Sequence, residues 1–137
     1  MKVETLQSSV VVKKAPRTGR SLFVVDDDPA VCRALSRLLR SHGYAVRSFP
    51  SADAFLRESP AQAPNCLVLD VQMPGTNGLT LQAELATSRP GIPVIIMTAL
   101  GSEATRDTAM RQGAVAYIEK PIRVEALLEA VRQATEH

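Results

Sequence analysis

The sequence has little of several residue types that mark large protein classes. It contains no tryptophan, two tyrosines, two histidines and two cysteines in 137 residues. No apolar run reaches the ~18 residues that a membrane-spanning helix needs, and the N-terminus lacks the apolar core of a secretory signal peptide. We therefore expect a cytoplasmic protein that does not associate with membranes. With 45% hydrophobic residues, the chain can form one domain with its own core, and it is too short for two.

The few cysteines and histidines do not indicate a disulfide, a zinc-type site or a phosphate-carrying histidine. Cys32 falls on the apolar face of a predicted helix and Cys66 opens an apolar strand, and neither belongs to a CxxC pair or a Cys/His cluster. Both are expected to be buried, reduced thiols. His42 ends a predicted helix and His137 is the last residue, so neither has the partners that a phosphate carrier needs.

Charge is unevenly distributed along the chain. Residues 1–20 contain five Lys and Arg against one Glu, for a net charge of +4, and we expect them to form a flexible basic tail. Residues 21–137 contain 11 basic and 13 acidic residues, for a net charge of −2. Phosphate contacts need clustered Lys and Arg, so we expect this domain, residues 21–137, to bind no nucleic acid.

From residue 21 onward, strand and helix patterns alternate five times. Three strands are apolar at every position, which is typical of a parallel sheet covered on both faces; they are LFVV (22–25), CLVL (66–69) and VIIM (94–97). The more mixed segments at 44–49 and 116–119 suit the edges of the sheet. The predicted fold class is α/β, a doubly wound five-stranded parallel sheet with helices on both faces.

The helices between these strands differ in how many apolar residues they offer. The first is expected to begin at Pro29, with Asp28 as its N-cap, and to end at 42–43. Its apolar face is predicted to consist of Val31, Leu35, Leu38 and Leu39. The fourth helix, 102–112, has almost no large apolar residue, so we expect it to be the least firmly packed and the most movable.

Residues with reactive chemistry follow the predicted strands. Asp26 and Asp27 follow the first strand, Asp70 the third, Thr98 the fourth and Lys120 the fifth. The carboxyl ends of parallel strands meet at one edge, where such folds bind their ligands. Two carboxylates ~4 Å apart repel by about 4 kcal/mol at an effective dielectric constant of about 20, so this cluster either costs stability or binds a cation. Hard oxygen ligands with room for water favour Mg²⁺.

Four segments, VVDDDP, LVLDVQMPGTNGL, VIIMTA and AYIEKP, occur in an order and spacing that resemble the response-regulator receiver domains of bacterial two-component signalling. The resemblance covers residues 21–135. It implies a flavodoxin-like strand order of 2-1-3-4-5. It also implies a signalling domain rather than an enzyme with a separate substrate, one that receives a phosphoryl group from a sensor histidine kinase or a phosphotransfer protein.

The resemblance assigns the acidic cluster to phosphorylation and metal binding. Asp70 matches the phosphoacceptor. Asp26 and Asp27 match the acid pair that holds Mg²⁺, Asp27 directly and Asp26 mostly through water. Gln72 would contribute its backbone carbonyl to the same metal ion.

The remaining site residues are assigned to charge neutralisation and switching. Thr98 matches the hydroxyl that bonds a phosphoryl oxygen, and Lys120 the cation that pairs with it. Pro121 matches the residue after a cis peptide bond that orients the lysine, and Tyr117 matches the aromatic switch position. Phosphorylation would alter the surface of residues 98–132, which in this family mediates dimerisation or partner docking.

Each of these residues also has a simpler interpretation. Taken alone, Thr98 is a turn residue and Lys120 a solvated charge, but the other motifs around them reverse both interpretations. Tyr117 as half-buried packing stays open. A flavin-binding electron carrier shares the strand order, although DDDP would repel a phosphate. A receiver-like module without phosphorylation would need one of the key residues to be missing. The sequence is compatible with an end at residue 137 and with continuation into an effector domain, because its first segments resemble receivers attached to helix-turn-helix domains.

Overall fold

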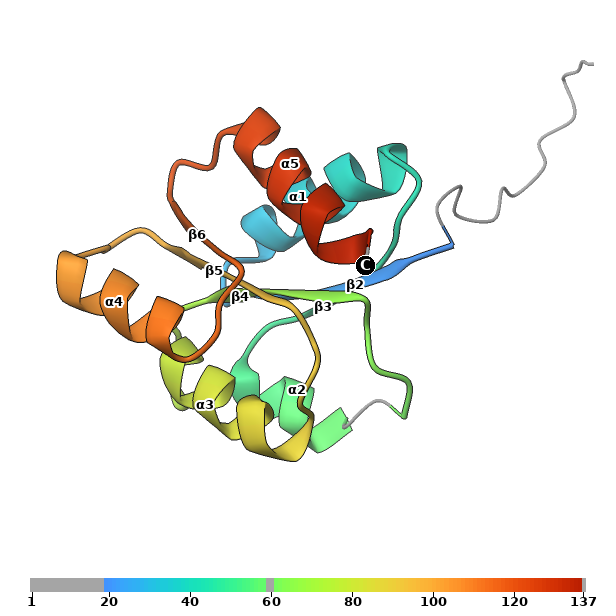
Figure 1. Cartoon of the computed structure of the whole chain (residues 1–137). Coiled ribbons are helices and arrows are strands. Elements are labelled where there is room, and N and C mark those ends of the chain that lie inside the picture. Colours follow the sequence, from blue (N-terminus) through green and yellow to red (C-terminus); the bar gives the residue numbers. More distant parts are fainter. Residues whose placement is uncertain (1–18, 59–60, 137) are drawn as a thin grey trace, which may run out of the picture.

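The computed structural model describes residues 19–58 and 61–136, so the predicted basic tail at 1–20 lies outside the described residues except for its last two. The described chain forms a five-stranded parallel sheet with helices on both faces (Figure 1). The strands are β2 (Ser21–Val25), β3 (Ala45–Phe49), β4 (Cys66–Asp70), β5 (Val94–Thr98) and β6 (Ala116–Glu119). The helices are α1 (Pro29–Ser41), α2 (Ala52–Glu58), α3 (Gly78–Ser88), α4 (Glu103–Arg111) and α5 (Val124–Thr135).

The order of strands in the sheet is β3-β2-β4-β5-β6, which is the predicted 2-1-3-4-5 order and confirms the fold class. The two mixed strands, β3 and β6, occupy the edges, as predicted. β4 and β5 lie inside the sheet and are buried at every position. Their side chains have no solvent-facing side, because helices cover both faces.

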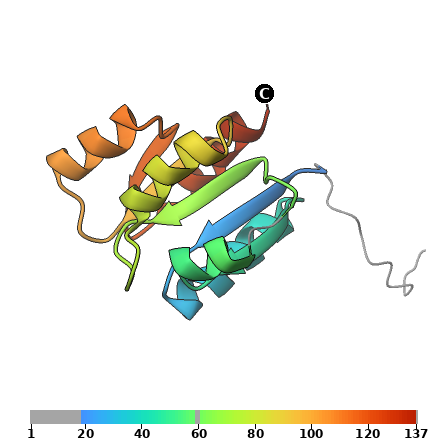
Figure 2. The same ribbon diagram turned by 90° about the horizontal axis from the view of Figure 1, so that it is seen from below.

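Two hydrophobic layers hold the helices to the sheet. Helices α1 and α5 cover one face, and α2, α3 and α4 cover the other (Figures 1 and 2). The first layer is centred on Leu22, Val24, Leu39, Leu127 and Val131. The second contains Phe23, Phe49 and Phe55, whose rings contact one another edge to face, with centroids 5.2–6.1 Å apart.

Helix α1 begins as predicted, but its buried face is rotated from the expected one. The Asp28 side chain accepts a hydrogen bond from the Ala30 amide at 2.9 Å and so caps the helix. Leu35 and Leu39 are buried, whereas Val31 and Leu38 are only partly buried. Val31 and Leu38 line an apolar groove between α1 and the segment joining β6 to α5. Smaller side chains of the same helix, a cysteine and a serine, are buried in the core instead.

Helix α4 has one buried residue, Ala109, whereas each of the other helices has three or four. This agrees with the expectation that it packs least firmly. A polar contact that the sequence did not predict holds it to α3. The buried Gln82 amide donates to the Ala109 carbonyl at 2.9 Å, and Gln112 donates to Gln82 Oε1 at 2.8 Å and to the Leu79 carbonyl at 3.1 Å.

The two cysteines are buried free thiols, as predicted. Burial raises the pKa of both thiols, that of Cys66 to about 12, so both stay protonated and poorly reactive near neutral pH. None of the helices within residues 19–58 and 61–136 is long and apolar enough to cross a membrane.

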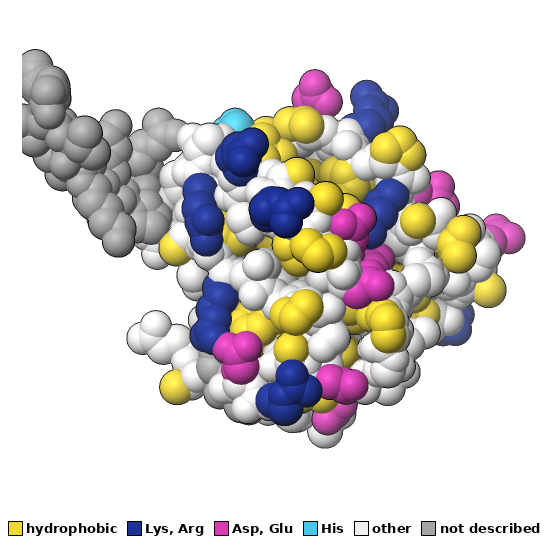
Figure 3. Space-filling model, turned by 180° about the vertical axis from the view of Figure 1, so that it is seen from behind, with side chains coloured by type: hydrophobic (Ala, Val, Ile, Leu, Met, Phe, Trp, Pro, Cys, Tyr) yellow, Lys and Arg dark blue, Asp and Glu magenta, His cyan; other side chains and the backbone are white. Residues whose placement is uncertain are grey.

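Arginine side chains are exposed along α1. Arg33, Arg37 and Arg40 line a groove beside this helix that reaches Asp26 and Pro50. In the view from behind, Lys and Arg side chains share the surface with acidic and hydrophobic ones (Figure 3). This face therefore presents charges of both signs.

Candidate functional site

The acidic residues of the sequence meet at the carboxyl edge of the sheet. Asp26 directly follows β2 and Asp70 ends β4, and these strands are neighbours in register, with Val25 beside Leu69. Asp27 completes the group, since one carboxylate oxygen from each of the three lies within 4.8 Å of the others. The strand order therefore brings together three aspartates from two segments of the chain. They lie between β2 and β4, where the strand order reverses.

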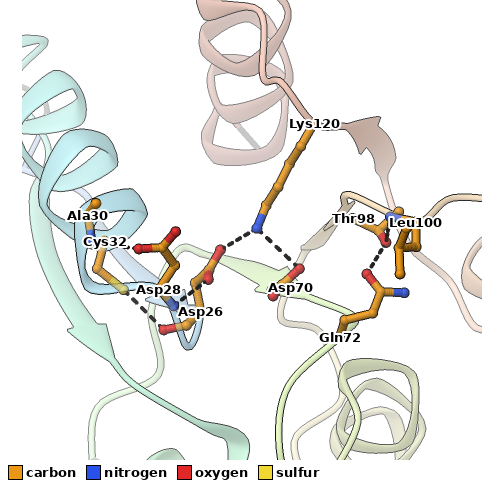
Figure 4. A network of polar contacts seen from close by, with 9 residues as sticks. All are labelled: Asp26, Asp28, Ala30, Cys32, Asp70, Gln72, Thr98, Leu100 and Lys120. Atoms are coloured by element: carbon orange, nitrogen blue, oxygen red, sulfur yellow. Dashed lines mark hydrogen bonds and ion pairs between the residues drawn. The ribbon is translucent and has the colours of Figure 1, made fainter.

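Asp26 is completely buried and is held from several sides (Figure 4). Its Oδ2 accepts a hydrogen bond from Lys120 Nζ at 2.8 Å, and its Oδ1 accepts one from the Asp28 amide at 2.9 Å. The Cys32 thiol donates to its backbone carbonyl at 3.3 Å. Both carboxylate oxygens of Asp26 thus have protein donors, which leaves the exposed Asp27 and the buried Asp70 better placed to bind a ligand directly.

Asp70 carries a costly negative charge. Its side chain is 3% exposed, and its Oδ1 lies 3.5 Å from Lys120 Nζ without a hydrogen bond from any described residue. Burial raises the pKa of this carboxyl to about 6, and the charge of Asp26 adds to the rise while Lys120 opposes it. An under-coordinated carboxylate at the end of a central strand is suited to react with, or bind, an incoming electrophile or cation.

Lys120 supplies the positive charge opposite the aspartates. Burial alone would lower the pKa of this ammonium group, but the hydrogen bond to Asp26 and the charges of Asp26 and Asp70 outweigh burial, so the pKa lies above its ordinary value. The peptide bond between Lys120 and Pro121 is cis. Because its pKa is raised, Lys120 stays charged at neutral pH, and its ammonium group contacts two carboxylates at once.

The donor set fits a divalent cation. Among the described residues, three carboxylates face a single ammonium group, which leaves two negative charges uncompensated by these residues when all are ionised. Carboxylate oxygens are hard ligands, and the unbonded Asp70 Oδ1 is a free coordination position. The cluster could therefore hold a metal ion of the Mg²⁺ type. Gln72 leaves β4 two residues after Asp70, so its backbone lies in the same loop.

Thr98 ends β5 and is completely buried. It lies on the side of Asp70 that faces away from Asp26 (Figure 4). Its hydroxyl donates a hydrogen bond to Gln72 Oε1 and accepts one from the Leu100 amide at 3.1 Å. The family resemblance implied a role for the Gln72 backbone only, and the contact of its side chain with Thr98 was not predicted. A glutamine in a loop carries no sequence signal for such a contact.

Tyr117 is placed away from the aspartates, toward α4. It lies on β6 beside Ile96, and its ring is partly buried in the layer that covers the α4 face. Its hydroxyl packs against Gly101, where a Cβ atom would come within 2.5 Å of it. Desolvation raises the pKa of this hydroxyl, and the charge of Glu119 adds to the rise, so Tyr117 stays neutral. The structure therefore connects Tyr117 to the segment before α4 rather than to Asp70.

Gly78 also shapes the site and was not predicted from the sequence. This glycine opens α3, and a Cβ atom there would lie 2.0 Å from the backbone carbonyl oxygen of Asp70. Asn77 caps the helix, and its side chain accepts from the Leu79 amide at 2.6 Å. Only glycine allows the start of α3 to approach the end of β4 this closely. A glycine directly after a capping Asn was the available signal.

Comparison with known proteins relates the chain to one family. The family model described as "Response regulator receiver domain" matches residues 22–132. The response regulator protein TmoT of Ectopseudomonas mendocina is 43% identical over 113 residues, which cover 82% of this chain and 51% of TmoT. The transcriptional regulatory protein FixJ of Rhizobium meliloti is 36% identical over 120 residues, covering 88% of this chain and 59% of FixJ.

Solved structures agree with this relationship. The structure of response regulator StyR superimposes with a TM-score of 0.77 at 41% identity, covering 85% of this chain and 59% of StyR. A structure titled FixJ-N has a TM-score of 0.77 at 36% identity and covers 86% of this chain and 94% of that one. The chain spans only about half the length of the first curated relatives that it matches.

Proposed function

The chain belongs to the response regulator receiver domains, and on that premise we propose that Asp70 accepts a phosphoryl group from the phosphohistidine of a sensor kinase or phosphotransfer protein. The observation that carries the proposal is the buried, under-coordinated Asp70 carboxylate between an acidic pair and Lys120. Homologues named as transcriptional regulators support an output in gene regulation through an effector partner or domain.

The transfer needs an anionic carboxylate to approach an anionic phosphoryl group. An Asp70 oxygen forms the new O–P bond while the P–N bond of the donor histidine breaks and its electron pair returns to the imidazole. Phosphoryl transfer depends mainly on positioning and on neutralising charge on the transferred oxygens. Mg²⁺ bound by Asp26, Asp27, Asp70 and the Gln72 carbonyl would supply part of that charge. Lys120 supplies the rest, and it is already within 3.5 Å of Asp70.

The output is proposed to be a change in the surface of residues 98–132. Thr98 links the site to the segment that leads into α4, because its hydroxyl accepts a hydrogen bond from the Leu100 amide. Helix α4 has a single buried residue and can move at low cost. Leu100 is 72% exposed and Met110 44% exposed, so this surface offers apolar contacts to a second copy of the chain or to another partner.

The direct test is phosphorylation by a small donor. The full chain is incubated with acetyl phosphate and Mg²⁺ and examined by intact mass spectrometry. One added phosphate is expected, and chelation of Mg²⁺ should suppress it. Asp107→Asn, which removes an exposed carboxylate on α4, serves as the matched control and should be labelled normally. Labelling of Asp70→Asn to the extent of the parent would refute the assignment.

A further inference from the structure

The side chain of Gln72 competes for the group that a phosphorylated Asp70 would need. Thr98 is completely buried, and its hydroxyl proton is donated to Gln72 Oε1 (Figure 4). The Thr98 hydroxyl oxygen also accepts a hydrogen bond from the Leu100 amide at 3.1 Å. A threonine hydroxyl has one proton to donate. Thr98 therefore cannot donate to Gln72 and to a phosphoryl oxygen at the same time.

Asp70 and Gln72 both lie near Thr98 (Figure 4). Gln72 follows Asp70 by two residues in the loop that leaves β4, and β4 and β5 are adjacent strands with Asp70 beside Met97. A phosphoryl group on Asp70 and the amide of Gln72 are thus within reach of one hydroxyl. Thr98 is buried whereas Gln72 is exposed, so the bond between them lies at the border between the site and the solvent.

We propose that the Gln72 side chain is a positioning residue that holds Thr98 in its resting contact and so opposes the switch. This role rests on the proposed phosphorylation of Asp70 and is separate from the proposed use of the Gln72 backbone carbonyl as a metal ligand. On phosphorylation, Thr98 exchanges its hydrogen bond from Gln72 to the phosphoryl group. Because the Leu100 amide is bonded to the Thr98 hydroxyl oxygen, a movement of this hydroxyl also moves the segment before α4.

The competition makes a quantitative prediction. A net intramolecular hydrogen bond changes an equilibrium constant by about two- to tenfold. Gln72→Met replaces Gln72 by a residue of similar length whose thioether sulfur is only a weak acceptor, and so frees the Thr98 hydroxyl in the resting state. The affinity of the protein for a phosphoryl mimic should then rise by about two- to tenfold.

The experiment is a double-mutant cycle on the full chain, with beryllofluoride and Mg²⁺ as the probe. Binding is followed by fluorine NMR in the parent, Gln72→Met, Thr98→Val and the double variant, and circular dichroism verifies that each is folded. Gln72→Met should tighten binding in the parent background and have no effect when Thr98 is replaced by Val. Thr98→Ser retains a hydroxyl and should restore the effect of Gln72→Met.

The outcomes separate the two proposals. If the parent binds beryllofluoride but Gln72→Met does not tighten binding, or tightens it equally with Val at position 98, Gln72 does not act through the Thr98 hydroxyl and the inference is overturned. If the parent does not bind beryllofluoride in the presence of Mg²⁺, the proposed function fails, and the inference fails with it.

Discussion

Removing the charge of Asp70 should make the metal-free protein more stable. Asp70→Asn keeps the size of the side chain and removes a buried carboxylate that lies close to two others. The folded-state pKa of Asp70 is raised from 3.8 to about 6, chiefly by burial. A group with a raised folded-state pKa stabilises the fold when protonated, and this contribution is lost as the pH rises through the folded-state pKa. At neutral pH the ionised Asp70 is therefore a cost to folding.

The size of that cost follows from the pKa values. The rise from 3.8 to about 6 corresponds to roughly 3 kcal/mol at about 1.4 kcal/mol per pKa unit. Part of the gain is offset in Asp70→Asn because Lys120 loses one of its two carboxylates and keeps Asp26. We expect a net stabilisation of about 1–3 kcal/mol, or a rise in Tm of several degrees for a domain of this size.

The assay is urea unfolding of parent and Asp70→Asn at pH 7.5 with EDTA, repeated at pH 5 and with saturating Mg²⁺. The difference should shrink at pH 5, where the parent carboxyl is largely protonated. It should also shrink with Mg²⁺, because a cation that binds only the folded parent stabilises it by mass action. The electrostatic reasoning is wrong if Asp70→Asn is less stable than the parent in EDTA. It is also wrong if the difference in free energy of unfolding between the two proteins changes with neither pH nor Mg²⁺.

Three further substitutions test separate parts of the structure. Lys120→Met leaves two buried carboxylates without their cation, and the metal-free variant should lose about 2–4 kcal/mol in urea unfolding, part of which Mg²⁺ should recover. Gln82→Leu breaks the bond to the Ala109 carbonyl, so it should cost about 1–3 kcal/mol and accelerate hydrogen exchange in α4; unchanged exchange there would contradict the anchoring role. Gly78→Ala places a Cβ atom against the Asp70 backbone and should cost about 2–4 kcal/mol, clearly more than the control Gly91→Ala, which has no atom within 4 Å and only its positive φ against it.

Sequence patterns predicted the parts of this molecule that depend on local chemistry. Strands β4 and β5 are apolar at every position because they are buried on both faces, and that pattern is readable without a structure. The capping Asp28 was predicted for the same reason, since a cap bonds its own helix. The strand order came from the family resemblance, and the structure reproduces it.

Contacts between distant polar side chains were not predictable in this way. The bond between Gln72 and Thr98, and the bonds from Gln82 and Gln112 that hold α4, join segments 26 to 33 residues apart and follow no period. The exposed fraction of Val31 also depended on what packs beside α1, which its own helix does not specify. Periodicity predicts which face of an element is apolar, but tertiary packing decides which residues of that face are fully buried.

The central claim, that Asp70 rather than a neighbouring aspartate carries the phosphoryl group, can be tested by chemical trapping. The protein phosphorylated with acetyl phosphate and Mg²⁺ is treated with borohydride, which reduces an acyl phosphate to the corresponding alcohol and so converts the modified aspartate to homoserine. Peptide mass spectrometry then locates the converted residue. We expect homoserine at position 70 and unmodified aspartates at positions 26 and 27. Homoserine at either of those positions, or its absence from position 70 in a protein that carries phosphate, would contradict the central claim.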